Sequence, residues 1–144
     1  MIRNVVAGDG PAIQELNKSQ LGYDYPVDKT INNLKRLISD ERHHLLLVFE
    51  DENETVLGYV HAEIFSESYF DPMLNVLALA VSGSAQGQGI GHALMLELET
   101  RAKQLGLTEI RLNSGEERTA AHQFYEKLGY RCLKLQKRFV KKVI

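Results

Sequence analysis

The spacing of apolar residues predicts strands and helices over positions 2–81 of the chain. Asp9 and Pro11 are typical of a helix start, because a proline in the first turn removes no hydrogen bond. Residues 74–81 are apolar on both faces apart from Asn75, which predicts a strand covered on both sides at the centre of a sheet. The expected elements are a strand at 2–6, a helix from 9 to about 19, a helix around 31–38, a hairpin of strands at 44–49 and 56–64, and a strand at 74–81.

The remainder of the chain is also predicted to form helices and strands. Apolar residues recur at helical spacing over residues 90–105, and Gly106 supplies a stop signal for this helix. After a strand at 107–112, residues 114–117 fit a capping box that opens a further helix, which Gly129 ends. The last two expected strands cover 130–135 and 138–143, and the whole order is β-α-α-β-β-β-α-β-α-β-β, a layered α/β (α+β) domain.

Composition is typical of one globular domain over residues 1–144. Hydrophobic residues make up 44% of the chain and charged residues 25%, with no repeat and no flexible linker. A net charge of -2 provides no global basic field, so nucleic acid is not an expected partner. The lone cysteine, Cys132, excludes an internal disulfide, and no apolar run reaches the roughly 18 residues that cross a bilayer. A cytoplasmic protein with no membrane partner is expected.

A glycine-rich segment, residues 83–91, stands between the most apolar strand and the helix at 90–105. Glycines let a backbone approach a ligand closely, and the free amides at a helix N-terminus attract anions such as a pyrophosphate. The alternative to an anion site is that this segment is only a flexible connection, although three alternating glycines exceed what a turn needs. A Walker loop is excluded because the chain has no Gly-Lys-Ser/Thr, and a dinucleotide fingerprint from Gly87 would require glycine at His92.

Two motifs narrow the identity of this anion site. Gln86, Gly89 and Gly91 fit Gln/Arg-x-x-Gly-x-Gly, and residues 121–130 read Ala-His-Gln-Phe-Tyr-Glu-Lys-Leu-Gly-Tyr. In these motifs, and in its order of elements, the chain resembles the GCN5-related N-acetyltransferase (GNAT) superfamily. The resemblance implies a mixed, mostly antiparallel sheet, acetyl-CoA (coenzyme A) as cofactor, and transfer of an acetyl group to a primary amine by direct attack.

The same resemblance assigns roles to residues. The backbone at 79–81 would bind the pantetheine arm, the amides at 86–91 would hold the pyrophosphate, and Tyr125 would protonate the departing thiolate. For Tyr125 a purely structural role in packing stays open. The expected cofactor-binding residues are Leu79, Ala80, Val81, Gln86, Gly87, Gln88, Gly89, Ile90, Gly91, Asn113 and Arg118.

The chain departs from the family pattern at two positions. Arg118 stands where many members carry an asparagine that contacts pantetheine or substrate, so this contact is not expected here. Arg118 could instead meet a phosphate. Asn75 stands where some members place a catalytic glutamate, and an amide cannot act as a base. A base is needed because an alkyl amine with a pKa near 10.4 is protonated at neutral pH. The open candidates are His61, Glu63, Glu67, Asp71 and water.

The acceptor is less defined than the cofactor. The aromatic segments at 23–25 and 69–70 are expected either to line a pocket for a small-molecule or peptide amine or to pack as ordinary loops. Two rival functions are a non-catalytic acyl-CoA sensor, which the amide at Asn75 favours, and a nucleotide-binding regulator. A homodimer is possible through the C-terminal strands. The five histidines show no metal-binding spacing, so no metal is expected.

Overall fold

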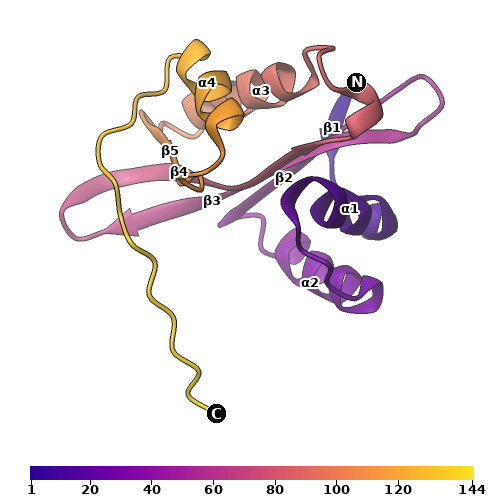
Figure 1. Ribbon diagram of the computed structural model, residues 1–144, viewed down its shortest axis with the longest axis horizontal. Helices are drawn as coiled ribbons and strands as arrows, with labels where there is room; N and C mark the ends of the chain where they lie inside the picture. Colours follow the sequence, from indigo (N-terminus) through magenta and orange to yellow (C-terminus); the bar gives the residue numbers. More distant parts are fainter. The chain divides into compact units, whose positions relative to one another are not determined.

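The computed structural model describes residues 1–144, and its strands form one sheet in the order β1-β2-β3-β4-β5 (Figure 1). Neighbouring strands from β1 to β4 run antiparallel, whereas β4 and β5 run parallel. This arrangement confirms the expected mixed, mostly antiparallel sheet. The strands are β1 (Ile2–Asn4), β2 (His44–Glu50), β3 (Val56–Glu67), β4 (Phe70–Val81) and β5 (Ile110–Leu112).

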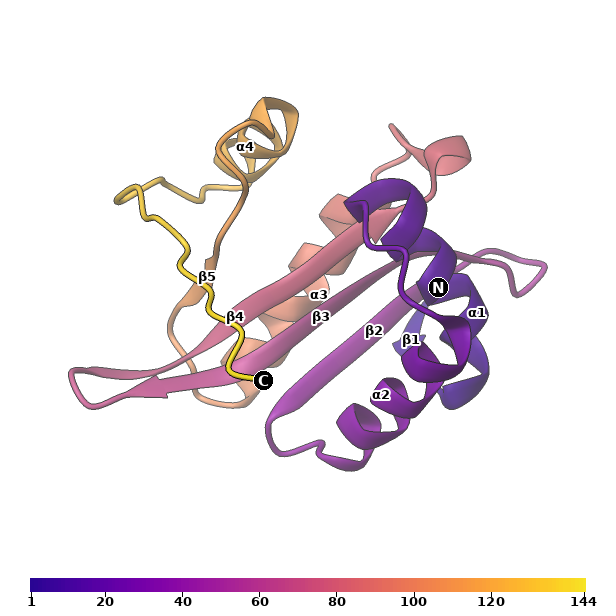
Figure 2. The ribbon, with the colours of Figure 1, turned by 60° about the horizontal axis from the view of Figure 1, so that its bottom comes forward.

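The chain divides into two compact units, Met1–Asn113 and Ser114–Ile144. In the first unit, α1 and α2 cover one face of the sheet and α3 covers the other (Figure 2). The second unit holds α4. No helix of the chain has the length and apolar character needed to cross a membrane. The helices are α1 (Gly10–Leu16), α2 (Val27–Ser39), α3 (Ile90–Gln104) and α4 (Thr119–Lys127), with short helical turns at Ala7–Asp9, Asn17–Leu21 and Gly83–Ala85.

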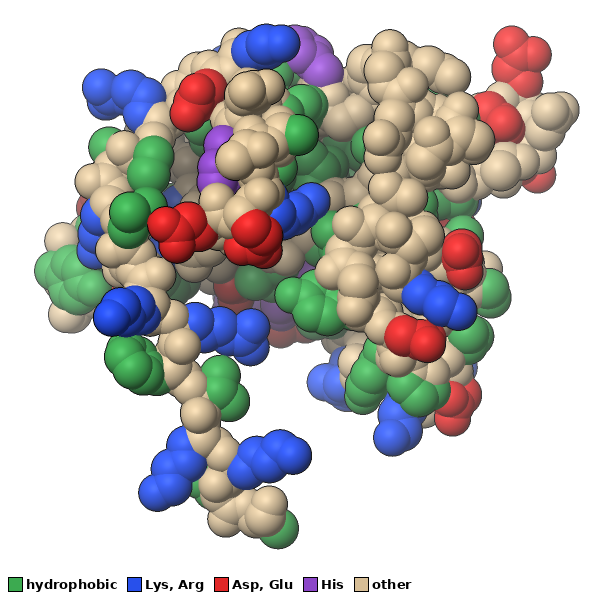
Figure 3. All heavy atoms as spheres, viewed as in Figure 1, with side chains coloured by type: hydrophobic (Ala, Val, Ile, Leu, Met, Phe, Trp, Pro, Cys, Tyr) green, Lys and Arg blue, Asp and Glu red, His purple; other side chains and the backbone are tan.

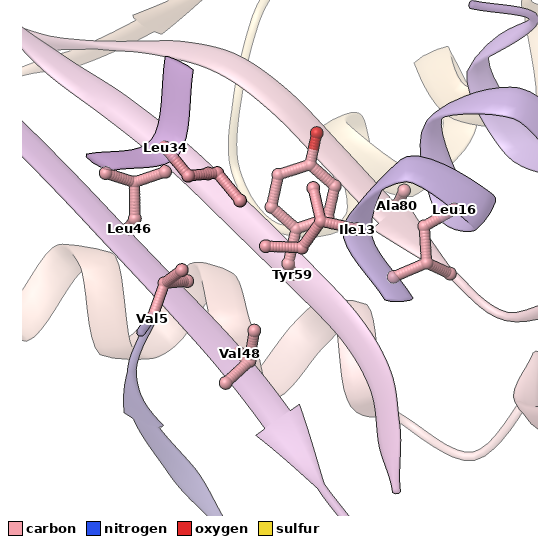
Figure 4. Packing of buried hydrophobic residues seen from close by; sticks show 8 residues of the cluster. All are labelled: Val5, Ile13, Leu16, Leu34, Leu46, Val48, Tyr59 and Ala80. Carbon is pink, nitrogen blue, oxygen red and sulfur yellow. The ribbon is translucent and has the colours of Figure 1, made fainter. Parts of the chain in front are cut away.

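Alternation along the central strands produces the two layers of the core. Leu46 and Val48 of β2 point toward α1 and α2, while Leu47 between them points toward α3 and is fully buried. Opposite Leu47, the α3 residues Leu94 and Leu98 are also fully buried. Figure 4 shows the cluster on the α1 and α2 side, which consists of Val5, Ile13, Leu16, Leu34, Leu46, Val48, Tyr59 and Ala80.

Asp9 directly precedes α1, but the expected capping of this helix by its side chain is wrong. Its carboxylate accepts a hydrogen bond from the Val6 amide at 2.8 Å and two from the Arg3 guanidinium at 2.9 Å, and none from the first turn of α1. Arg3 also donates to Glu50 at 3.0 Å. Arg3 therefore joins two acidic residues that are only 6% and 7% exposed, which ties β1, β2 and the start of α1 together.

Two predicted features of the second unit are wrong. The capping box at 114–117 does not form, because α4 begins only at Thr119 and leaves its first amides out of reach of Ser114. The strands predicted at 130–135 and 138–143 are also absent, since α4 is the only regular element of this unit and a strand needs a neighbour to bond. Basic side chains are spaced along this C-terminal segment (Figure 3), and its large apolar residues Leu133, Leu135, Phe139, Val140 and Val143 are 76% to 86% exposed.

Candidate functional site

The turn between β4 and α3 presents bare backbone at the start of a long helix. Gly87 and Gly89 adopt left-handed conformations with φ of 80° and 79°, and Gly89 is the N-cap of α3. No side chain caps this helix, so its first amides remain available to a ligand. A Cβ atom placed at Gly87 or Gly89 would meet no other atom within 4 Å. The turn thus combines uncapped amides with open space beside them, which is the geometry of an anion site.

Neighbouring contacts hold this turn in place. The side chain of Gln86 binds residues outside α3. Its Nε2 donates to Gln20 Oε1 at 2.8 Å and to the Val81 carbonyl at 3.4 Å. Ile90 is 4% exposed and lies against Gly58 of β3, where an added Cβ would stand 3.1 Å from the Ile90 side chain. Gln86 and Ile90 therefore anchor the turn through their side chains, and what they offer a ligand is backbone. Gln88 is exposed in the turn before α3, and Gly91 lies in the first turn of the helix.

One edge of β4 is unpaired beside this turn. β5 pairs with β4 only from Leu74 to Val76, so no strand pairs with the following residues of β4 on that side. The hydrogen bond from Ser82 N to Leu57 O sets the phase of the β3–β4 ladder. In an antiparallel ladder the hydrogen-bonding direction alternates, so Leu79 and Val81 direct their N–H and C=O groups to the free edge.

Ala80 lies between these two residues and differs from them. It pairs with Tyr59, and the same alternation directs its backbone groups toward β3. Of the three residues expected to bind an extended arm, Leu79 and Val81 thus have free backbone groups, whereas Ala80 contributes the buried side chain that fixes the strand.

A β-bulge at Leu77 marks the place where β4 leaves β5. Ala62 pairs with Val76 and His61 with Ala78, which leaves Leu77 without a partner in β3. Bulges bend the strand, increase its twist and often lie next to active sites. Here the bulge immediately follows the last residue that pairs with β5, so it accounts for the opening at the free edge.

Tyr125 lies on α4 in the second unit, half-buried between two aromatic rings. The ring centroids of Phe124 and Tyr130 are 5.1 Å and 6.0 Å from that of Tyr125, both in edge-on geometry. Burial raises the pKa of Tyr125, and the positive charge of Arg118 opposes part of this rise. The phenol is therefore protonated at neutral pH and can donate its proton.

The two other expected contacts to the cofactor are exposed. Asn113 ends the first unit, where its Oδ1 accepts a hydrogen bond from Arg111 Nη2 at 3.4 Å. Arg118 belongs to the second unit and is the N-cap of α4, with no capping hydrogen bond from its side chain. The roles predicted for both side chains stay predictions.

The candidate bases fall into three different environments. His61 contacts His44, with His44 Nδ1 and His61 Nε2 3.0 Å apart. Glu63 accepts a hydrogen bond from Asn75 Nδ2 at 2.8 Å. Asn75, which stands where some family members have a glutamate, thus binds the carboxylate of Glu63. Glu67 and Asp71 lie at the β3–β4 hairpin, where Asp71 is exposed and a hydrogen bond with Glu67 raises the pKa of exposed Tyr69.

A pocket lies between the sheet and the helices α1 and α2. Its lining includes Tyr25, Asn33, Tyr59 and His61 and contains no Asp, Glu, Lys or Arg. Of the aromatic segments predicted to line an acceptor pocket, the first contributes Tyr25. The segment at 69–70 does not line it, because its rings pack on each other and on Phe65 at the hairpin.

Sequence reasoning missed the partner of His61. His44 and His61 are 17 positions apart, and only the register of β2 and β3 makes them neighbours. Two histidines placed on the same face of two strands joined by a hairpin were the available signal. The contact of Gln20 with Gln86 carried no such signal, since Gln20 lies in an irregular helical turn.

Comparison with known proteins places these features in a family. The model of the acetyltransferase (GNAT) family matches residues 11–130. Mycothiol acetyltransferase of Kocuria rhizophila is 35% identical over 92 residues, which cover 63% of this chain and 30% of that protein. The matched segment thus spans less than a third of this relative's length.

Solved structures share the fold at lower identity. A transcriptional regulator from Bacillus halodurans superposes with a TM-score of 0.88 at 23% identity, covering 98% of this chain and 99% of the other. AAC(6')-Iy, in complex with the bisubstrate analogue CoA-S-monomethyl-acetylneamine, has a TM-score of 0.84 at 17% identity and covers 99% of this chain and 97% of its own. The uncapped helix, the open glycine turn and the free edge of β4 fit acetyl-CoA, the cofactor of the matched family. The chain belongs to the acetyltransferase (GNAT) family.

Proposed function

We propose that this protein is an N-acetyltransferase that transfers an acetyl group from acetyl-CoA to a primary amine of a small molecule or peptide by direct attack. The observation that carries the proposal is the uncapped N-terminus of α3 beside a free strand edge. A helix start attracts phosphate groups, and a strand edge accepts an extended chain. These two features lie next to each other in the chain, as a ligand with a pyrophosphate and an extended arm requires.

Three parts of the chain would act on this cofactor. Leu79 and Val81 would pair with the amides of the pantetheine arm through their outward backbone groups, and the amides from Gly87 to Gly91 would hold the pyrophosphate. When bound, acetyl-CoA supplies the acetyl group as a thioester. Tyr125 would provide the proton that the departing sulfur takes, since a phenol is protonated at neutral pH.

The acceptor class follows from the family and from the reaction. Family members with related folds include aminoglycoside and glucosamine-6-phosphate N-acetyltransferases, which are amine acetyltransferases by name. A primary amine is therefore the proposed nucleophile. We place the reaction in the cytoplasm, and we propose that two copies associate through the C-terminal segment, whose apolar residues are exposed in a single chain. Light scattering at micromolar concentration tests the association against a monomer of 16.3 kDa.

A screen for coenzyme A release tests the proposed function. Purified protein is incubated with acetyl-CoA and with small alkyl amines, aminoglycosides, amino sugars or peptide N-termini in turn. Release that depends on one of these amines supports the transferase. The rival sensor module, which the absence of an acidic residue at Asn75 favours, predicts tight acetyl-CoA binding by calorimetry and no release with any amine. That result would refute the transferase.

A further inference from the structure

The pocket between the sheet and helices α1 and α2 adjoins the place where β4 opens. His61 lines this pocket and pairs with Ala78, which directly precedes Leu79 on the free edge of β4. Cross-strand partners have Cβ atoms about 5 Å apart. His61, in the wall of the pocket, therefore lies opposite the residue that directly precedes the backbone expected to bind the pantetheine arm.

His61 has one ring nitrogen in use and one free. Nε2 lies 3.0 Å from His44 Nδ1, whereas Nδ1 has no hydrogen-bond partner in the protein. Of these two nitrogens, one from each ring, one must donate the hydrogen bond and the other must accept it. If His61 Nε2 carries the hydrogen, Nδ1 of His61 has a lone pair that can accept a proton.

His44 in turn faces a carboxylate. The register places Glu63 directly opposite His44, and Asn75 directly opposite Glu63. Asn75 Nδ2 donates to Glu63 Oε2 at 2.8 Å, so this carboxylate is held in place on the residue that pairs with His44. A positive charge on His44 would therefore be stabilised by Glu63 across the strand pair.

Other groups around the pair do not compete for this role. Arg111 pairs with Asn75 from β5, and its guanidinium stacks on Phe65, 4.6 Å from the ring centroid. Asp40, at the end of α2, is paired with His43 at 2.8 Å. From the helix side the pocket wall carries no formal charge, and the hydroxyl of Tyr59 donates to Asn17.

We propose that the acceptor amine enters this pocket, that His61 Nδ1 takes the proton it loses, and that His44 receives that proton through the imidazole contact. This proposal rests on the acetyl transfer proposed above. The acceptor nitrogen forms a bond to the acetyl carbon, and the carbon–sulfur bond breaks with its electron pair on sulfur, which takes a proton from Tyr125. The N–H proton passes to His61 Nδ1 while the Nε2 hydrogen of His61 moves to His44 Nδ1. His44 becomes imidazolium opposite Glu63.

The second histidine is needed because His61 alone is a weak base. Burial, and then the charge of His44, lower the pKa of His61 from 6.5 to about 4. A proton would leave His61 quickly, and His44, half-buried at the start of β2, can pass it to water. The low basicity has an advantage, since His61 is neutral and ready to accept throughout the neutral pH range.

The lining of the pocket also limits the acceptor. Since no charged side chain lines it, the part of the acceptor next to the amine should be uncharged and partly apolar. Asn33 and Tyr25 place polar side chains on this lining that can bond hydroxyl or amide groups, whereas the Thr30 hydroxyl already donates to the Pro26 carbonyl. An acceptor with a second charge close to its amine would leave that charge without a partner.

Two variants and a matched control test the relay. His61→Gln and His44→Gln keep the size and polarity of each side chain but cannot carry a proton, and His43→Gln changes a neighbouring histidine whose side chain is 66% exposed. We expect His61→Gln to lower kcat by about 100- to 10,000-fold, the usual contribution of a general base, with unchanged acetyl-CoA affinity. His44→Gln, a positioning change, should lower kcat less and should shift the acidic limb of the pH profile of kcat. His43→Gln should behave as wild type.

A measurement without substrates completes the test. In ¹⁵N NMR titrations of the free protein, His61 should stay neutral down to about pH 4, and His44→Gln should raise its pKa because a neighbouring charge is removed. If the wild type acetylates an amine while His61→Gln keeps its kcat and pH profile, the relay is refuted and the proposed function stands. If the wild type acetylates no amine, both proposals fail.

Discussion

The substitution Gly89→Ala separates backbone strain from cofactor binding at the start of α3. Gly89 has φ of 79°, and a Cβ built there meets no atom within 4 Å. An alanine in the left-handed region costs about 1–2 kcal/mol, and no steric clash adds to this cost. Gly106, just after α3, offers a matched control, since its φ is 75° and its Cβ would also meet nothing. Both substitutions should therefore destabilise the fold by the same amount, about 1–2 kcal/mol.

The two variants should differ in acetyl-CoA binding. The space beside Gly89 is where the α3 amides would hold a pyrophosphate, so the new methyl group should exclude it and weaken affinity at least about tenfold, or about 1.4 kcal/mol. Gly106→Ala should keep wild-type affinity. Urea unfolding measures the stability of both variants, and calorimetry measures their affinity. Equal affinities for the two variants would show that the turn does not hold the cofactor.

Three further predictions address the acid, the N-terminal ion cluster and pH. Tyr125→Phe should lower kcat about 10- to 10,000-fold and leave acetyl-CoA affinity intact in calorimetry; an unchanged kcat would remove Tyr125 from the mechanism. Burial alone would raise the pKa of Asp9, but hydrogen bonds from Arg3 and the Val6 amide hold it below its usual value. Arg3→Met should therefore destabilise the fold by about 2–4 kcal/mol in urea unfolding and raise that pKa; a loss under about 0.5 kcal/mol would contradict it. Because the pKa of His61 falls from 6.5 in the unfolded chain to about 4 when folded, its contribution to stability is full above pH 6.5 and is lost toward pH 4. The wild type should therefore lose about 2–3 kcal/mol of unfolding free energy between pH 7 and pH 4, and His61→Gln should not show this loss. The same pH dependence in both proteins would exclude His61 as its source.

Local signals were enough for most elements and for the cofactor turn. The helix expected at 90–105 is α3, Ile90–Gln104, because helical periodicity and a glycine stop act within a few residues. The glycine turn was predictable for the same reason, since its conformation depends on residues adjacent in sequence. Pairing extended β4 back to Phe70, beyond the expected start at residue 74, because ladder hydrogen bonds do not depend on apolar side chains.

Features that depend on distant partners were not predictable. The capping box failed because the start of α4 at Thr119, not the motif, determines which amides are free. The expected strands at 130–135 and 138–143 have strand-like sequences but no neighbour to pair with in their unit. A strand forms only when it can hydrogen-bond to a second strand, and the sequence of the segment alone does not specify that partner.

The sequence by itself thus determined the order of the elements as far as α4, the turn that would bind the cofactor, and the motif that contains Tyr125. Only the tertiary structure decided where the free edge of β4 begins, because the bulge at Leu77 and the short pairing of β5 are properties of three strands together. It also decided that His44 contacts His61 and faces Glu63. Side-chain neighbours across a sheet are set by register, and a shift of one residue would send each of these side chains to the other face.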